Sequence, residues 1–100
     1  MMPAPCILYK QGVSGDLQTV AQKGLGRVAE LFFANNLDLI VTSIREGNHM
    51  PGSLHYIGLA FDFRKGPFRK ADIEAVLSPP WQVIEEADHW HCEYDYACQP

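Results

Sequence analysis

The chain has 100 residues, of which 47% are hydrophobic and 20% are charged, and its formal net charge at pH 7 is −4. This composition predicts one globular domain over residues 1–100 with a single hydrophobic core, and it excludes a disordered chain. The negative charge argues against a nucleic-acid-binding protein, because affinity for phosphate backbones comes mainly from clustered Lys and Arg. Only Arg64-Lys65 and Arg69-Lys70 approach a basic patch. We interpret these pairs as a solvated loop and a helix start, with a docking surface for an anionic polymer as the alternative.

The first ten residues have neither the basic start nor the apolar run of a signal peptide, and no later stretch approaches the roughly 18 apolar residues of a membrane span. We therefore expect a monomer that does not insert into membranes and that stays in the cytoplasm until another system releases it. Three cysteines are too few for a disulfide scaffold. We expect Cys92 in the core, and a Cys92–Cys98 bridge stays open as an alternative.

A long amphipathic helix is the first regular element that the sequence predicts, after an irregular N-terminus. Ser14-Gly15-Asp16 offers an N-cap, apolar residues then recur at helical spacing, and Asn35-Asn36 ends the helix. Gly24 and Gly26 lie inside it, and we expect them to mark close packing against another element. The β-branched run 39–44 predicts a buried strand, followed by a Gly- and Pro-containing loop over 45–52.

The second half of the chain predicts three more strands and a short helix. A strand is expected over 58–63, then a helix with Pro67 at its first position and a stop at Ser78-Pro79-Pro80. Strands over 81–85 and 89–94 are separated by only a few residues, which favours an antiparallel pair. The order of elements indicates an α+β domain in which helices cover a small antiparallel sheet.

Two short segments carry the residue types of a metal site. His55 and Asp62 lie seven residues apart around Gly58, and Asp88 lies three residues before His91. Three such ligands with one free carboxylate are typical of a catalytic zinc centre, whereas a structural site is closed by four protein ligands.

Strand periodicity supports part of this site and complicates the rest. In 89–94 the alternation places Trp90, Cys92 and Tyr94 toward the core and His89, His91 and Glu93 on the other face. A solvent-exposed sheet face would explain Glu93 but not two histidines. In a regular strand, positions 55 and 62 would point to opposite faces of the sheet, and so would positions 88 and 91. Each pair therefore needs irregular backbone to reach one face. Gly58 can supply it in the first pair, and a turn before the strand can supply it in the second. A helix would place positions seven apart on one face, so periodicity alone leaves that alternative open.

The pattern Ser53-x-His55-x-x-Gly58-x-Ala60-x-Asp62, followed by Asp88-x-x-His91, resembles the zinc D-alanyl-D-alanine metallopeptidases, which share a fold with lysostaphin and hedgehog proteins. The resemblance runs from about residue 39 to residue 94. It implies that His55, Asp62 and His91 bind zinc and that Asp88 is the general base. Ser53 is then expected to contact substrate.

The resemblance also implies two further roles. Arg45 follows a strand, as an oxyanion-stabilising arginine does in that family, although the chain has Thr42-Ser43-Ile44-Arg45 where the family usually has Ser-Gly-Tyr-Arg. A plain surface arginine is the alternative. His89, the first histidine of a His-x-His pair, is expected either to stabilise the oxyanion or orient substrate, or to support a ligand. His49 is expected to be a loop histidine.

The function that follows is hydrolysis of a peptide bond in the peptidoglycan stem peptide or cross-link, by a D,D-carboxypeptidase or an endopeptidase of phage or prophage origin. The alternative is a non-catalytic zinc-binding module of the same fold that acts in recognition or virion assembly. A binding module needs the ligands but has no use for a general base, so Asp88 separates the two hypotheses.

Overall fold

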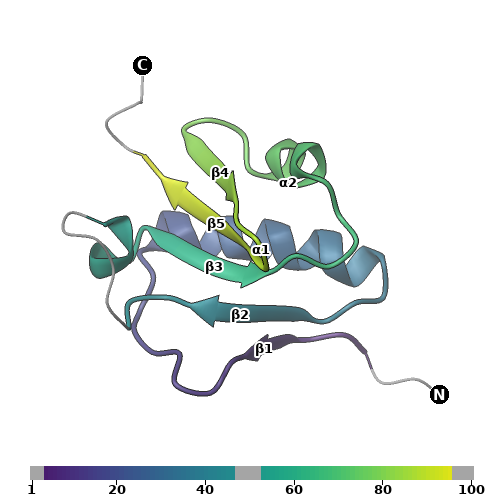
Figure 1. Ribbon diagram of the computed structural model, residues 1–100, viewed down its shortest axis with the longest axis horizontal. Coiled ribbons are helices and arrows are strands. Elements are labelled where there is room, and N and C mark those ends of the chain that lie inside the picture. The colour runs from purple at the N-terminus through teal and green to yellow at the C-terminus, as the bar shows by residue number, and fades with distance from the viewer. Residues whose placement is uncertain (1–3, 47–52, 96–100) are drawn as a thin grey trace.

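The computed structural model describes residues 4–46 and 53–95, except for the side chain of Tyr56. Within these ranges lie five strands, two α-helices and one short 3-10 helix (Figure 1). In chain order they are β1 Ile7–Tyr9, α1 Thr19–Ala34, β2 Leu39–Ser43, η1 Leu54–Ile57, β3 Ala60–Arg64, α2 Lys70–Val76, β4 Trp81–Glu85 and β5 His89–Tyr94.

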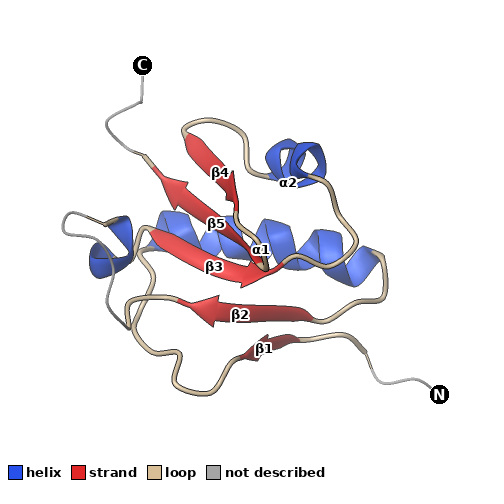
Figure 2. Cartoon of the chain, viewed as in Figure 1, coloured by secondary structure: helices blue, strands red, loops and turns tan. Residues whose placement is uncertain are grey.

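The strands form one sheet in the order β1-β2-β3-β5-β4, and the fold is the predicted α+β class (Figure 2). All neighbouring pairs are antiparallel except β1 and β2, which are parallel. β1 was not predicted, because the prolines around it indicate irregular chain. It forms because Leu39 N–H and Lys10 N–H donate to carbonyls of the opposite segment, Cys6 and Val41, over 3.1 and 2.9 Å.

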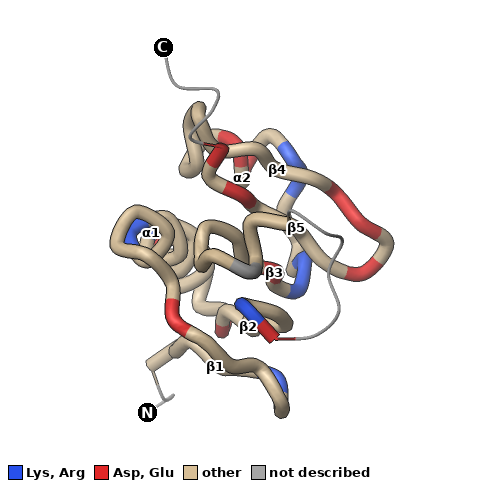
Figure 3. The backbone as a smooth tube through the Cα atoms, turned by 90° about the vertical axis from the view of Figure 1, so that its left-hand side faces the viewer, with Lys and Arg blue, Asp and Glu red and all other residues tan. Residues whose placement is uncertain are grey.

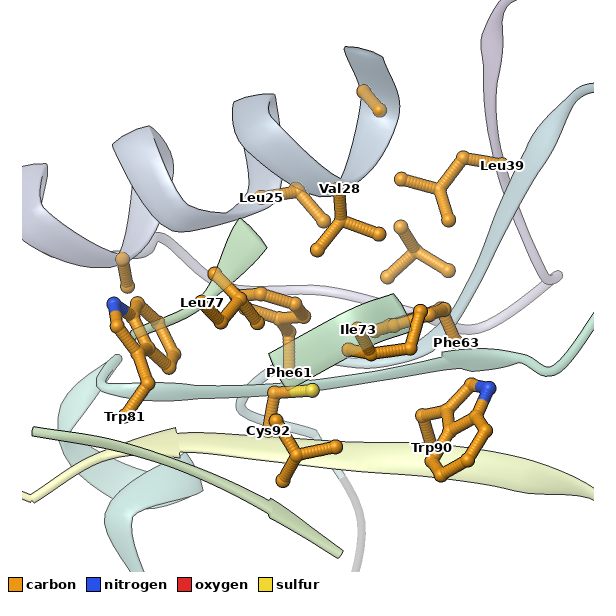
Figure 4. Packing of buried hydrophobic residues seen from close by; sticks show 14 of the residues in the cluster. Leu25, Val28, Leu39, Phe61, Phe63, Ile73, Leu77, Trp81, Trp90 and Cys92 are labelled. Carbon is orange, nitrogen blue, oxygen red and sulfur yellow. The ribbon is translucent and has the colours of Figure 1, made fainter. Parts of the chain in front are cut away.

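The helices α1 and α2 cover one face of the sheet, and neither of them covers the other face, which we call the open face (Figures 1 and 2). Alternate strand residues point into a core against α1 and α2, because successive side chains of a strand face opposite ways (Figure 4). The fully buried strand residues include Leu39, Val41, Phe61, Phe63, Trp90 and Cys92. Residues at the intervening positions, Asp62 and His91 among them, therefore belong to the uncovered face.

Gly24 of α1 packs against the side chain of Trp81, the first residue of the edge strand β4. A Cβ added to Gly24 would lie 2.3 Å from Cζ2 of Trp81, a distance that no side chain can occupy. The expected close packing is thus confirmed for Gly24. It is wrong for Gly26, where an added Cβ would meet no atom within 4 Å.

The helix α1 begins at Thr19, after Gln18, and not at the predicted cap in residues 14–16. Those residues make tertiary hydrogen bonds instead: Ser14 N–H donates to the Glu46 carboxylate, and Ser14 C=O accepts from Arg45 N–H. Gly15 has a φ of 105°, a left-handed conformation outside the helical region. The contacts of this segment with the end of β2 therefore override its local capping signal.

The helix α2 also begins later than predicted. Gly66, with a φ of 63°, and Pro67 form a turn, and the helix begins at Lys70. Asp72 caps it by accepting from Arg69 N–H over 2.9 Å. Phe68 before the helix packs on Phe32 of α1, with ring centroids 4.8 Å apart, and this contact occupies the residues that would have formed the first turn. Neither helix in the described ranges is long and apolar enough to cross a membrane.

Candidate metal centre

His55 reaches the open face of the sheet from η1, a short helix that the sequence did not predict. Ser53 caps η1, because its hydroxyl accepts from His55 N–H over 3.2 Å. Gly58 ends η1 with a φ of 74°, and a Cβ there would lie 2.6 Å from the Asp16 carbonyl oxygen. The irregular backbone expected between His55 and Asp62 is therefore confirmed, and Gly58 is the residue that permits it.

Asp62 and His91 stand directly opposite each other on β3 and β5. The Asp62 Oδ1 atom lies 2.8 Å from His91 Nδ1 and 3.1 Å from His55 Nε2, and the two ring nitrogens are themselves 3.1 Å apart. His55, Asp62 and His91 are thus brought together as a group that could hold a metal ion. The side chains of all three are largely buried, with exposed fractions of 3%, 14% and 16%.

Partners on the far side of each imidazole fix which nitrogen faces the cluster. His55 Nδ1 donates to the Ile44 carbonyl over 2.5 Å, and His91 Nε2 donates to Glu93 Oε1 over 2.7 Å. Because a carbonyl and a carboxylate only accept, these two nitrogens carry the protons. The nitrogens that face Asp62 are then lone-pair donors in the neutral rings, which is the usual arrangement of metal-binding histidines.

Three lone pairs therefore converge, an arrangement that a metal cation or a proton between them would stabilise. Ligand atoms of a tetrahedral zinc ion at about 2.0 Å lie about 3.3 Å apart, so the observed separations require only a few tenths of an ångström of expansion. Two imidazoles and one carboxylate also match the nitrogen and oxygen ligands that zinc accepts. The residues present fit a zinc ion with one coordination position left open.

The charges of the metal-free cluster favour a proton where the metal would bind. Burial alone would raise the pKa of Asp62, but its hydrogen bonds and charge interactions with His55 and His91 outweigh burial and lower it. Burial alone would lower the pKa of His91, but its hydrogen bonds to Asp62 and Glu93 raise it. The metal-free protein thus favours an ionised Asp62 beside a protonated His91.

Zinc affinity and metal-free stability should respond oppositely to pH. Zinc must displace the proton of His91, so its apparent affinity should fall about tenfold per pH unit below the raised pKa of His91. In the metal-free protein the protonated His91 stabilises the fold below the unfolded-state pKa of about 6.5, and this contribution is lost as pH rises through the raised folded-state pKa. Asp62 contributes stability that is lost only in acid, below about pH 4.

Competition with a chromophoric chelator and thermal unfolding between pH 5 and 9 measure both trends. A zinc affinity that does not change over this range would show that no proton leaves the cluster when the metal enters.

A cleft of about 550 Å³ lies on the open face next to this cluster. The described residues that line it are Lys10, Thr42, Ser43, Asp62, Arg64, Asp88 and His89. His89 connects the two carboxylates of the cleft, because its Nδ1 is 2.7 Å from Asp88 Oδ1 and its Nε2 is 3.7 Å from Asp62 Oδ2. The hydrogen bond to His89 lowers the pKa of Asp88, so Asp88 is ionised at neutral pH.

The structure places the other predicted site residues as follows. Asp88 lies in the bend before β5, as expected, with 89% of its side chain exposed. Ser53 caps η1 and supports His55 from the backbone. Arg45 is exposed, its stem lies against Gly15, and it is not among the described residues that line the cleft. Its predicted oxyanion role stays a prediction. His49 and Cys98 lie outside the described residues.

Cys92 is a buried free thiol on the core side of β5, as predicted. Burial raises its pKa, with a smaller contribution from the charge of Asp62. A thiol that stays protonated is a poor metal ligand, so Cys92 belongs to the core and not to the metal cluster.

Three residues of this region were missed as site residues. Glu93 was taken for a surface residue, yet it orients His91, and its position two residues later on the same strand face is a signal that could have revealed it. Arg64 likewise lies two residues after Asp62, on the same face of β3, so the same signal could have revealed it. Lys10 carried no signal, because β1, the strand that ends just before it, was not predicted.

Comparison of the sequence with models of known protein families finds no match, and comparison with curated proteins finds none either.

Proposed function

We propose that this protein is a zinc-dependent hydrolase that cleaves a peptide bond in the peptidoglycan stem peptide or cross-link. The observation that carries the proposal is the convergence of His55, Asp62 and His91 lone pairs beside a cleft that contains a further ionised carboxylate. The spacing of these residues, which resembles that of the zinc D-alanyl-D-alanine metallopeptidases, supports the choice of substrate.

The roles of the residues follow from their positions. Zinc, when bound, would polarise a peptide carbonyl and lower the pKa of a water molecule. Asp88 accepts a proton from the attacking water and returns it to the leaving amine, because it is ionised and shares the cleft with Asp62. His89 holds the Asp88 carboxylate at the cleft through their 2.7 Å hydrogen bond.

Digestion of purified muropeptides tests the proposal. The protein loaded with zinc, the metal-free protein and the Asp88→Asn variant are incubated with monomeric and cross-linked fractions, and the products are identified by mass spectrometry. Loss of a terminal D-alanine would identify a carboxypeptidase, whereas cleavage within the stem or cross-link would identify an endopeptidase. The proposal fails if the zinc-loaded protein leaves every fraction intact.

Arg45→Ala measures the remaining role that the resemblance implies. Loss of an oxyanion donor typically reduces kcat by about 10²–10³, so turnover should fall by this factor while zinc content stays unchanged. Steady-state kinetics and metal analysis of the same preparations provide the comparison. Near-normal turnover would show that Arg45 is a plain surface residue, and oxyanion stabilisation would then be assigned to zinc and His89.

One observation favours a second function, a non-catalytic zinc-binding module. Asp88 is 89% exposed and its carboxylate is hydrogen-bonded to His89, whereas a general base must reach the water that attacks the substrate. Tight zinc binding without hydrolysis of any peptidoglycan fraction would establish this function instead.

A further inference from the structure

Two cationic side chains, Lys10 and Arg64, line the cleft, and no step of the proposed chemistry is assigned to either, although, after the hydrogen bond to His89, the charge of Lys10 makes a small contribution to lowering the pKa of Asp88. Arg64 is the last residue of β3 and stands opposite His89 in the ladder between β3 and β5. Lys10 follows β1, and its N–H donates to Val41 C=O over 2.9 Å, which anchors it beside β2. Both side chains are exposed, and neither forms an ion pair with any residue in the described ranges. Each is therefore available to a ligand.

The charges of the cleft favour an anionic ligand once the metal is present. Its two carboxylates, Asp62 and Asp88, balance the two cations, so a divalent ion leaves the cleft with a net positive charge. Asp62 directs Oδ1 into the metal cluster, and Asp88 bonds His89, so neither carboxylate neutralises Arg64 directly. With the metal bound, the cleft would thus be positive within a chain whose net charge is −4. Figure 3 shows the basic segments at β3 and just after β1, and acidic segments at the tip of the β4–β5 hairpin.

The distance from the metal cluster limits where the anionic group can be. Arg64 is two residues beyond Asp62 on the same strand face, which separates their Cα atoms by about 7 Å. A peptide advances by about 3.5 Å per residue, so a group held by Arg64 lies within about two residues of the bond at the metal. The planar guanidinium of Arg64 suits a carboxylate, which it can hold through two parallel hydrogen bonds.

We propose that Lys10 and Arg64 form a carboxylate-binding subsite that holds a free carboxylate of the substrate close to the bond that is cut. This inference rests on the proposed hydrolase function and defines its substrate further, as a peptide with an anionic group within two residues of the scissile bond. The C-terminal carboxylate and the carboxylate of an internal D-glutamyl residue are two such groups in a stem peptide.

Calorimetric titration with two pairs of peptides tests the subsite. One pair is an acylated peptide that ends in D-alanyl-D-alanine, as the free acid and as the C-terminal amide. The other is a stem peptide whose internal D-glutamyl carboxylate is free or amidated. Binding is measured in the zinc-loaded Asp88→Asn background, where turnover does not interfere, and KM and kcat are measured in the background with Asp88 intact.

Arg64→Gln and Lys10→Gln are compared with Arg69→Gln and Lys23→Gln, which remove exposed cations outside the cleft. In one pair the free acid should bind about tenfold more tightly than the amide, the scale of one exposed charge-assisted interaction. Arg64→Gln and Lys10→Gln should remove most of this preference and raise KM about tenfold with little change in kcat or zinc content. The control variants should retain the preference, and the pair that shows it identifies which carboxylate is bound.

Equal binding of acid and amide in both pairs, or an unchanged preference in Arg64→Gln and Lys10→Gln, would overturn the subsite. If the protein still cleaves peptides in that case, the proposed hydrolase function stands without the subsite. Conversely, a preference that depends on Arg64 and Lys10 in a protein that cleaves no peptide would retain the subsite and refute the hydrolase.

Discussion

Replacement of any one of His55, Asp62 and His91 should abolish tight zinc binding, because each would supply one of the three ligands that the described residues bring together. Loss of a residue that merely orients a ligand typically weakens metal binding 10–100-fold, and loss of a ligand itself should exceed this. We expect about one zinc ion per wild-type chain and substoichiometric zinc in His55→Gln, Asp62→Ala and His91→Ala after dialysis. Metal analysis of the dialysed proteins provides the measurement.

Thermal unfolding shows whether the metal acts on a preformed site. Zinc at a hundredfold excess over its Kd should stabilise the wild type by about 2.7 kcal/mol, because it binds the native state, and should not stabilise the variants. All variants should fold without metal, since the hydrophobic core lies on the other face of the sheet. Glu93→Gln keeps all three ligands, so its zinc affinity should fall only about 10–100-fold, which is typical for the loss of a residue that orients a ligand. Full zinc occupancy in all three ligand variants would refute the site.

Asp88→Asn should reduce hydrolysis of peptidoglycan peptides by about 10² or more, the usual scale for a positioned general acid–base group. The substitution keeps the shape of the side chain and removes its ability to accept a proton. Zinc content should stay near that of the wild type, because Asp88 is outside the ligand cluster. Thermal stability should also change little, because 89% of the side chain is exposed.

His89→Gln serves as the matched companion of this variant, because His89 binds Asp88 but is not a metal ligand. Turnover should fall less than in Asp88→Asn if His89 acts by holding the base. Loss of zinc from Asp88→Asn would instead identify Asp88 as a fourth ligand and the centre as a closed structural site. Unchanged hydrolysis in Asp88→Asn would assign the base elsewhere.

The sequence predicted most reliably where its local signals and the tertiary contacts agree. β4 and β5 were predicted with the observed bounds, since apolar alternation and a short connection both favour an antiparallel pair. The helix starts were wrong where they disagree. Residues 14–16 carry capping side chains, but Ser14 bonds to Arg45 and Glu46, which are about 30 residues away in the chain and invisible to a local pattern.

The metal ligands could be predicted because their residue types and spacing resemble those of a known metallopeptidase family. His91 and Glu93 share a strand face through simple alternation, and Gly58 indicates the irregular turn that brings His55 to the same face as Asp62. The spacing does not predict how each side chain is oriented or which atoms it contacts. The sequence therefore could not show that Glu93 binds His91 or that Ile44 fixes the tautomer of His55.

By itself, the sequence determined the α+β class and the polar face of 89–94, because periodicity is a property of neighbouring residues. The three candidate ligands followed from the resemblance of their motif to a known family. Only the tertiary structure decided the parallel pairing of β1 with β2, and with it the position of Lys10 in the cleft. The pairing of segments more than 30 residues apart depends on which surfaces the folded chain buries together, and no local propensity encodes that choice.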